Sequence, residues 1–369
     1  MQRVYIRPIG FTASPQSENG NAVRIAGGMV YAYRFAITLR EDGELVRREV
    51  VSADGITAAL GGLPDGMRAE AETQWSNLRK VHSPITCGER FIRLDQPQIM
   101  GILNVTPDSF SDGGQYLDAP EAMRDRAAAM LEAGAAIIDV GGESTRPGAD
   151  TVWEGEEIER VVPAVQTCAA MGAAISVDTR RPAVMEAAID AGADIINDVS
   201  ALTHDPRSLA YAASSGRPVV LMHAPGSGAN LHANATYHDV VSEVFEWLRE
   251  RRDAALEAGI AAEKIILDPG LGFGKSLTEN LALMNALALF HALGHPVLLG
   301  VSRKRMIGAL SHEAPADKRL AGSLTLAQAG MDAGVQLLRV HDVTETVQAR
   351  DVWRGLRDAA ITDFSEVPE

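Results

Sequence analysis

The sequence predicts an α/β fold, a (β/α)8 or TIM barrel preceded by a small N-terminal α+β appendage, on three observations. From Gln98 onward, short apolar runs typical of buried strands recur eight times. Alanine-rich segments of helical character lie between most of these runs. Several of the segments stop at a glycine, which is the usual end of a helix. Eight near-equal units favour a closed barrel over the alternative, an open doubly wound sheet.

The barrel domain is expected to span residues 96–369. The predicted strands are, in order, Ile99–Leu103, Ala135–Val140, Ala173–Val177, Asp194–Asn197, Pro218–Met222, Lys264–Leu267, Pro296–Val301 and Val335–Val340. The clearest predicted helices are Pro120–Ala133, Pro182–Ala191, Asp239–Ala258 and Ala321–Ala333, each followed by glycine. The joints between helix and strand, such as Ala133-Gly134-Ala135, indicate tight turns.

Residues 1–95 have a different character and form the predicted appendage. Arg3–Ile6, Gly28–Leu39 and Leu45–Val51 are rich in β-branched and aromatic residues, as strands are. Glycine pairs and Asp-Gly steps separate them, and Ala69–Lys80 is compatible with a helix. No chemical motif lies in this part, so we expect it to serve packing or oligomerisation.

Composition excludes several classes of protein. The net charge is −15 and no run of lysine and arginine occurs, which disfavours a nucleic-acid partner. No stretch approaches 18 apolar residues, so no membrane association is expected. The first residues lack the apolar centre of a secretory signal. Cys87 and Cys168 lie in no catalytic motif, and reduced structural thiols in a cytoplasmic protein are expected.

Polar side chains stand at the end of every predicted strand. The strand ends are Asn104, Asp139, Asp178, Asn197-Asp198, Met222-His223, Asp268, Ser302-Arg303-Lys304 and Arg339-Val340-His341. The carboxyl ends of barrel strands are where such enzymes place their chemistry. Amides and carboxylates occupy the middle strands and cations the last two. This division predicts a ligand with a neutral, donor-rich end and an anionic end.

Three of these strand ends have simpler readings that the sequence leaves open. Asn104, before a polar loop of Pro, Asp, Ser and Gly, is also common turn chemistry. Asp268, before Pro269-Gly270, could be a cap, and Asn197 could be a turn residue. The stretch ending Gly274-Lys275-Ser276 nearly forms a P-loop, but proline occupies the position of its first glycine. A nucleoside triphosphatase is therefore rejected.

Taken together, seven sequence blocks resemble the dihydropteroate synthases of folate synthesis. They are MGILNVTPDSFSDGG, IIDVGGESTRPGA, ISVDTRRP, IINDVSAL, ILDPGLGFGK, GVSRKRMIG and LLRVHDV, spanning about residues 98–343. Each block alone is weak, but seven in order are specific. The resemblance does not extend to the appendage.

The resemblance implies a transferase that condenses a dihydropterin pyrophosphate with p-aminobenzoate. The products are dihydropteroate and pyrophosphate, Mg2+ is the cofactor, and sulfonamides compete with p-aminobenzoate. Small-molecule substrates and a homodimer are therefore the expected partners.

The resemblance also implies roles for individual residues. Asp178, Lys304, Arg339 and Asn104 are the implied catalytic residues, and the Asn104 oxygen is the implied metal ligand. The implied substrate-binding residues are Asp112, Thr145, Arg146, Asp178, Asn197, Met222, Asp268, Gly272, Phe273, Ser302, Lys304, Arg339 and His341. A carboxylate accepts the paired donors of a pterin edge, and an arginine fork suits phosphate.

Two positions depart from the family. Arg305 stands where serine is frequent, and the segment from Ala224 to Gly228 differs from the usual Met-His-Met pattern.

Two other functions stay open. One alternative is a pterin-binding methyltransferase that uses methyltetrahydrofolate, which needs no pyrophosphate donors such as Arg146 and His341. The other is a non-catalytic paralogue, which would be expected to lack some of these groups.

Overall fold

Eight parallel strands form the centre of the molecule. The computed structural model describes residues 2–106, 119–144, 152–226, 232–233 and 235–362. The strands are β7 (Gln98–Asn104), β8 (Ile137–Gly141), β9 (Ile175–Asp178), β10 (Ile195–Asp198), β11 (Val219–Met222), β12 (Ile265–Asp268), β13 (Leu298–Leu299) and β14 (Leu337–Val340). They are ordered β12-β11-β10-β9-β8-β7-β14-β13. A parallel bridge from Leu267 to Val297 joins the two ends, which confirms the closed barrel.

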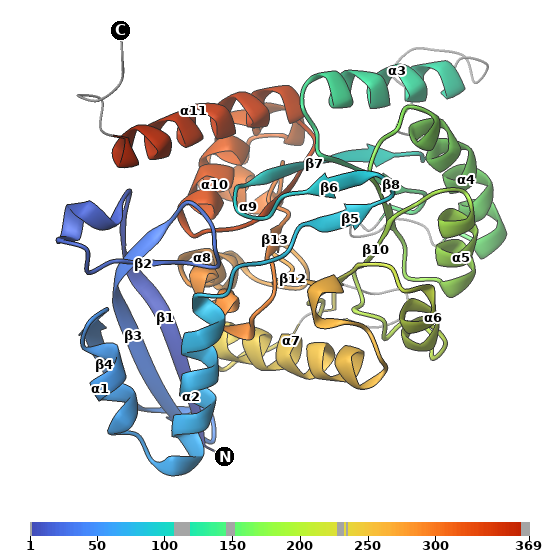
Figure 1. The fold of residues 1–369 in the computed structure, drawn as a ribbon. Coiled ribbons are helices and arrows are strands. Elements are labelled where there is room, and N and C mark those ends of the chain that lie inside the picture. The colour runs from blue at the N-terminus through green and yellow to red at the C-terminus, as the bar shows by residue number, and fades with distance from the viewer. Residues whose placement is uncertain (1, 107–118, 145–151, 227–231, 234, 363–369) are drawn as a thin grey trace, which may run out of the picture.

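Helices surround the strands, as Figure 1 shows. They are α3 (Ala119–Glu132), α4 (Glu154–Ala170), α5 (Pro182–Asp190), α6 (Ser208–Ser215), α7 (Val240–Glu257), α8 (Leu277–Asn285), α9 (Arg305–Leu310), α10 (Leu320–Asp332) and α11 (Val343–Ile361), with 3-10 turns η3 (Ala262–Lys264), η4 (Leu287–Leu293) and η5 (Ala316–Lys318). The predicted glycine stops are present: Gly134 after α3 and Gly192 after α5 have φ of +98° and +115°. Such angles favour glycine, which lacks the Cβ that would clash there.

A short hairpin closes the amino-terminal end of the barrel. Its strands are β5 (Ile85–Cys87) and β6 (Arg90–Ile92), which pair antiparallel. Its inward residues form one apolar cluster with residues at the amino-terminal ends of all eight barrel strands. The cluster contains Ile85, Cys87, Ile92 and Leu94 together with Met100, Ile137, Ala174, Ile195, Val220, Ile266, Leu298 and Leu337. The hairpin is thus packed as part of the barrel core, although it precedes residue 96.

The appendage is an antiparallel sheet with two helices. It contains β1 (Gln2–Thr12), η1 (Pro15–Glu18), β2 (Val23–Arg24), β3 (Tyr31–Glu41), β4 (Glu44–Ser52), α1 (Ile56–Gly61) and α2 (Asp65–Leu78). β3 is central and pairs with β1, β2 and β4. α2 packs on this sheet through Trp75, whose ring meets Phe35 edge-on at 5.0 Å.

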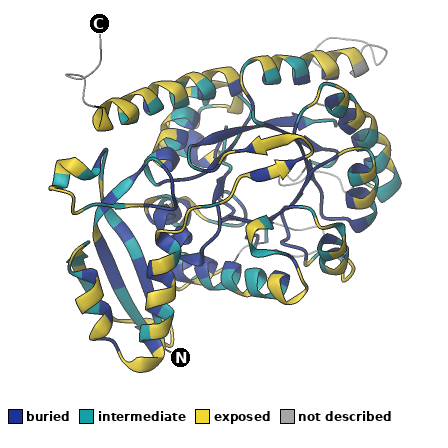
Figure 2. Cartoon of the chain, in the orientation of Figure 1, coloured by how far each residue is buried: buried dark blue, intermediate teal, exposed yellow. Residues whose placement is uncertain are grey.

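The appendage docks on α7 and η4 through both apolar and polar contacts. Tyr5 meets Phe245 edge-on at 5.5 Å. Glu70 of α2 accepts from Arg249 at 2.7 Å, and Asn77 donates to the carbonyl of Ala292 at 2.9 Å. The dark blue of buried residues runs from the appendage sheet into the barrel strands (Figure 2). One continuous core therefore joins the two parts.

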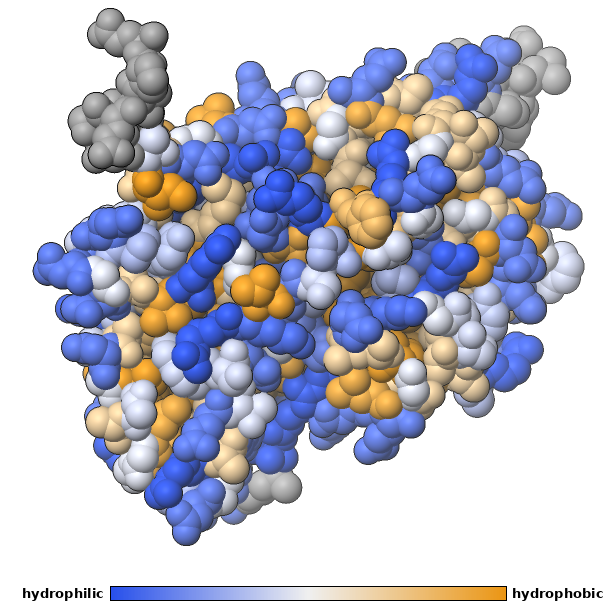
Figure 3. Space-filling view, viewed as in Figure 1, coloured by the Kyte–Doolittle hydropathy of each residue, from blue (hydrophilic) through white to orange (hydrophobic). Residues whose placement is uncertain are grey.

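Hydrophilic residues cover most of the face drawn in Figure 3, and hydrophobic ones lie among them in separate small groups. Within the described part of the chain, none of the helices is both long enough and apolar enough to span a bilayer.

Candidate active site

The sheet register brings polar residues of β7, β9 and β10 to one level of the barrel, with a glycine of β8 between the first two. Asn104 of β7 pairs with Gly141 of β8, Gly141 with Asp178 of β9, and Asp178 with Asn197 of β10. Gly141 leaves space between its neighbours: a Cβ there would lie 3.4 Å from Asn104 Oδ1 and 3.5 Å from Asp178 Cβ. The amide of Asn104 and the carboxylate of Asp178 thus border the same space.

Arg339 links the acids across this level. Its Nε donates to Asp139 Oδ2 and its Nη2 to Asp178 Oδ2, both at 2.6 Å. Asn197 Nδ2 donates to Asp139 Oδ1 at 3.2 Å. Asp139 is fully buried and Asp178 nearly so, whereas Arg339 is half-buried. Two carboxylates therefore fix the guanidinium plane of Arg339 at the mouth of the barrel.

Burial and charge act against each other on these groups. Burial raises the pKa of Asp178, an effect that Arg339 opposes and that Asp139 reinforces. For Arg339, burial lowers the pKa, but Asp139 and Asp178 outweigh it and hold the pKa above its ordinary value. Arg339 thus stays charged and supports the anionic form of Asp178.

A second acid lies at the end of β12. Asp268 is buried, and its Oδ1 accepts from the Gly270 amide at 2.7 Å. Its Oδ2 accepts no hydrogen bond from the described residues, so one oxygen is available to a ligand. Burial raises the pKa of Asp268 to about 6, although the Gly270 amide and Lys304 lower it. Asp268 pairs in register with Met222.

Lys304 extends across the opening toward this acid. Its Nζ lies 4.4 Å from the centre of the Phe273 ring, within the range of a cation–π contact. Burial lowers the pKa of Lys304 to about 8, partly offset by Asp268. Gly272 has φ +81°, and a Cβ there would lie 2.9 Å from Lys304 Cδ. The glycine thus gives the lysine stem its path.

An apolar wall completes this side of the site. Met222, Phe273, Val199 and Ala224 form a buried cluster separate from the main core. His232 stacks on Phe273 with ring centres 4.9 Å apart and planes inclined by 10°. A flat ring held by Asp268 and Asn197 would find apolar contact here.

The last two strand ends meet near β7. His341 donates its backbone N–H to Ser302 Oγ at 3.1 Å, and its Nδ1 lies 3.0 Å from the same oxygen. Arg303, whose φ is +57°, forms a two-point ion pair with Asp342, including Nε to Oδ2 at 3.0 Å. Ser302 and His341 therefore face one another, while Arg303 is held by Asp342.

Among proteins of known family, the sequence profile described as "Pterin binding enzyme" matches residues 100–341, about two thirds of the chain. The chain belongs to this family. The site lies at the carboxyl ends of the strands within the matched residues, where pterin binding enzymes of this fold are expected to carry it.

Individual members of the pterin binding enzyme family are similar to this chain over most of their own length. Dihydropteroate synthase of Escherichia coli K12 is 48% identical over 260 residues, which is 70% of this chain and 91% of that protein. The structure of Xanthomonas albilineans dihydropteroate synthase with 4-aminobenzoic acid has a TM-score of 0.70 at 45% identity and covers 78% of this chain and 100% of that one. The same enzyme with 7,8-dihydropteroate gives 0.67 and 42%, covering 77% of this chain and 100% of that one.

Three predicted site residues, Asp112, Thr145 and Arg146, lie outside the described residues. The remaining ones, namely Asn104, Asp178, Asn197, Met222, Asp268, Gly272, Phe273, Ser302, Lys304, Arg339 and His341, all stand at the carboxyl ends of strands or in the loops that follow. Arg305, the departure from the family pattern, is exposed at the start of α9.

Sequence reasoning assigned no role to several residues that organise the site. Lys275 donates to the carbonyls of Gly270 at 2.7 Å and Phe273 at 3.2 Å, so it binds its own loop. Burial lowers its pKa to about 7. Ser276 caps α8 in a capping box with Glu279. The Gly-Lys-Ser run is thus loop and cap chemistry, in agreement with the rejection of a P-loop.

A buried ionic cluster surrounds Glu143, which lies shortly after β8. Glu143 accepts from Arg181 at 2.9 Å and from Arg180 at 3.2 Å, and Arg181 also pairs with Glu157. Glu143 Oε1 additionally accepts from the Val152 amide at 3.2 Å. It therefore ties together two points on either side of residues 145–151. In the sequence, the Arg180-Arg181-Pro182 run is the signal that could have indicated this ionic cluster.

Proposed function

We propose that this chain is a dihydropteroate synthase of folate biosynthesis. It would join 6-hydroxymethyl-7,8-dihydropterin pyrophosphate to p-aminobenzoate, releasing 7,8-dihydropteroate and pyrophosphate. The observation that carries this proposal is the ring of groups around one barrel mouth: Arg339 between two acids on one side, and Asp268 with Lys304 on the other. The ring occurs in a chain 48% identical to a dihydropteroate synthase.

Asp268 and Asn197 would hold the pterin edge. The Oδ2 of Asp268 can accept from ring and exocyclic N–H groups, and Asn197 can both donate and accept. Lys304 would donate to the pterin carbonyl side, and Met222 would pack on the ring. Arg339 can lie flat on the ring because Asp139 and Asp178 hold its plane. Phe273 and Ser302 would border the p-aminobenzoate.

The pyrophosphate end of the substrate would be bound by Asn104, Thr145, Arg146 and His341. Asp112, which follows β7 in the sequence, would contribute to substrate binding. The Asn104 oxygen is suited to Mg2+, which takes few protein oxygens and completes its shell with substrate and water. No cluster of three or more His, Cys, Asp or Glu side chains suited to a metal occurs among the described residues. The donor set therefore fits a cation that enters together with the pyrophosphate. When bound, Mg2+ would neutralise part of the charge of the pyrophosphate.

The reaction exchanges one bond for another. The C–O bond between the pterin methylene and the pyrophosphate breaks, and its electron pair leaves with the pyrophosphate. Asp178 lies where its negative charge would stabilise the electron-poor pterin. The amine of p-aminobenzoate then forms the C–N bond and loses one proton. Arg146 and His341 would stabilise the leaving group.

The proposal extends to assembly, location and inhibition. A homodimer is expected, and α11 offers a surface for it because Val352 and Leu356 are 62% and 69% exposed. Cys87 and Cys168 are both free and buried, in keeping with a cytoplasmic enzyme. Sulfonamides should compete with p-aminobenzoate, because they share its flat aniline and anionic end.

The direct test is an assay for dihydropteroate from the two substrates, with and without Mg2+. Product that depends on both substrates supports the proposal, and no product from folded protein contradicts it. Inhibition by a sulfonamide that p-aminobenzoate fails to relieve would contradict the proposed pocket.

A pterin-binding methyltransferase remains the alternative. It would share the contacts of Asp268 and Asn197, but the Ser302–His341 pair beside Arg339 provides donors that it does not need. Methyl transfer from methyltetrahydrofolate, without formation of dihydropteroate, would favour it. A non-catalytic paralogue would bind pterin and show neither activity.

A further inference from the structure

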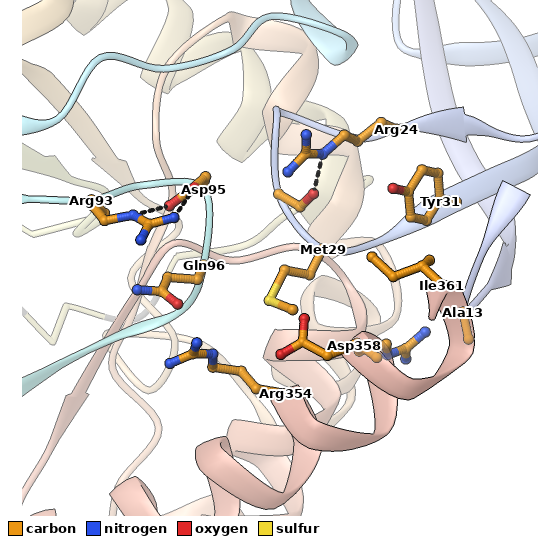
Figure 4. A pocket seen from close by; sticks show the side chains of 12 residues that line it. Ala13, Arg24, Met29, Tyr31, Arg93, Asp95, Gln96, Arg354, Asp358 and Ile361 are labelled. Carbon is orange, nitrogen blue, oxygen red and sulfur yellow. Dashed lines mark hydrogen bonds and ion pairs between the residues drawn. The ribbon is translucent and has the colours of Figure 1, made fainter. Parts of the chain in front are cut away.

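A cavity of about 190 Å3 lies between the appendage and the barrel, apart from the candidate active site. It is lined by Ala13, Arg24, Gly28, Met29, Tyr31, Arg93, Asp95, Gln96, Arg354, Arg357, Asp358 and Ile361 (Figure 4). Residues 93–96 precede β7, and residues 354–361 form the second half of α11. The cavity is therefore at the amino-terminal end of the barrel, whereas Asp178 and Asp268 are at the other end.

The lining gathers positive charge in an otherwise acidic protein. Four arginines face two aspartates, although the whole chain has a net charge of −15. Arg93 and Asp95 neutralise one another in a two-point pair, with Nε to Oδ1 at 3.0 Å. Arg357 is shared with Asp332, at 2.6 Å, outside the cavity. The remaining lining charges are Arg24, Arg354 and Arg357 against Asp358, and Arg24 also acts electrostatically on Asp95.

Two of these arginines retain donors for a ligand. Arg24 uses Nε, which donates to the carbonyl of Gly28 at 2.5 Å, and none of the described residues occupies its Nη atoms. The Nε of Arg354 is buried and finds no hydrogen-bond partner among the described residues. A buried donor without a partner is unfavourable, and an oxygen of a bound anion would satisfy it. The two side chains come from opposite walls, one from the appendage and one from α11 (Figure 4).

We propose that this cavity binds a small phosphate-bearing anion that bridges the appendage and the barrel. Guanidinium forks pair with phosphate oxygens in two-point contacts, which a single lysine cannot do. The volume is below the roughly 300 Å3 at which pockets for drug-sized ligands begin. It suits phosphate, pyrophosphate or a small organic phosphate, whose carbon part would meet Met29 and Tyr31. Because the anion contacts both walls, its binding stabilises their docking.

The test uses the full-length protein and calorimetric titration with phosphate, pyrophosphate and glycerol 3-phosphate, which separates inorganic from organic sources. Arg24→Gln with Arg354→Gln should weaken binding by about tenfold or more, as expected for lost charge-assisted bonds. Asp358→Asn should tighten binding by about two- to fivefold, because it removes the opposing charge of an exposed acid. Arg47→Gln is the matched control, because Arg47 is exposed on β4 and pairs with Glu49.

Several outcomes would overturn the proposal. One is the absence of saturable binding of all three anions, and another is affinity unchanged by the double substitution. Equal weakening by Arg47→Gln would indicate only general attraction. Turnover without added anion should be the same in the double variant and the wild type, which separates this cavity from the active site. A chain ending at Thr362 should bind with unaltered affinity. Binding seen only in that shorter chain would also overturn the proposal.

Discussion

At the residue scale, Asp268 combines a proposed binding role with a cost in stability. Burial raises its pKa in the folded protein to about 6, well above the ordinary value of an aspartate, so folding favours the neutral acid. That stabilisation is complete below about pH 4 and is lost as the pH rises through 6. At pH 7 the protein therefore carries a buried charge that the N–H groups of a bound pterin would stabilise through hydrogen bonds.

Asp268→Asn separates these two effects. Asparagine keeps an oxygen for the Gly270 amide but presents a donor where Oδ2 faces the donors of the pterin. Pterin affinity should fall by about 2–4 kcal/mol, because a buried polar group is mispaired. The midpoint of thermal unfolding at pH 7 should not fall. Asp205→Asn, at a partly exposed acid paired with Arg207, is the control, and wild-type pterin binding in calorimetry would refute the assignment of Asp268.

Asp178→Asn tests the order of bond breaking. The variant can still accept from Arg339 Nη2, so pterin binding should fall only modestly. Release of pyrophosphate without p-aminobenzoate should slow by about 10²–10³-fold, the usual effect of removing an electrostatic contact made in the transition state. If Asp178 were only a ground-state ligand, binding and rate would fall together. Equal losses in the two measurements would therefore reject the cation-stabilising role.

Lys304 predicts a pH dependence of pterin binding. Its pKa is lowered to about 8 by burial, so the ammonium form present at pH 7 is lost as the pH rises through 8. A neutral amine donates more weakly, so the dissociation constant should rise between pH 7 and pH 9. Lys304→Met should bind weakly and show no change across this window. A wild-type affinity independent of pH there would exclude a charged contact.

At the element scale, the loop after β12 shows how backbone shape places a side chain. Gly272→Ala would put a Cβ 2.9 Å from Lys304 Cδ at a φ of +81°. Both effects are unfavourable, so we expect a shifted lysine and a pterin affinity reduced by about tenfold, from about 1–3 kcal/mol of backbone strain. Gly259→Ala is the control, because that glycine has a φ of +97° with nothing within 4 Å. Equal effects on pterin binding would show that the lysine path is not involved.

The barrel could be predicted from sequence because its strands are apolar runs that end in polar residues. Those positions are set by the sheet register, which places Asn104, Asp178 and Asn197 at one level. The ion pairs of Arg339 with Asp139 and Asp178 could not be predicted, since they depend on side-chain paths across the barrel. The same holds for the cluster around Glu143.

The hairpin of β5 and β6 was also missing from the sequence prediction. Its strands have three residues each and few apolar positions, so neither periodicity nor length distinguishes them from a loop. The barrel supplies the apolar surface on which they pack, because Ile85 and Ile92 are buried against the amino-terminal ends of the barrel strands.

At the scale of the whole molecule, the continuous core determines which parts of the chain can be removed. The predicted division at residue 95 would cut off the hairpin together with the appendage. A division before β5 keeps the hairpin and removes only the appendage sheet and its helices. Removal of the appendage exposes Phe245 on α7, and each large apolar side chain uncovered costs about 1.5–3 kcal/mol.

Two shortened chains test this division and the expectation that residues 1–95 are dispensable for chemistry. A chain beginning at Ser83 should keep turnover, because all the candidate site residues lie beyond Gln98, and should unfold at a lower temperature than the full protein. A chain beginning at Asp95 lacks the hairpin and exposes the apolar base of all eight strands, so we expect it to aggregate. Circular dichroism, thermal unfolding and the dihydropteroate assay distinguish the outcomes. A folded, soluble chain from Ser83 without activity would show that the appendage contributes to the site, whereas a stable, active chain from Asp95 would show that the hairpin is not needed to close the barrel.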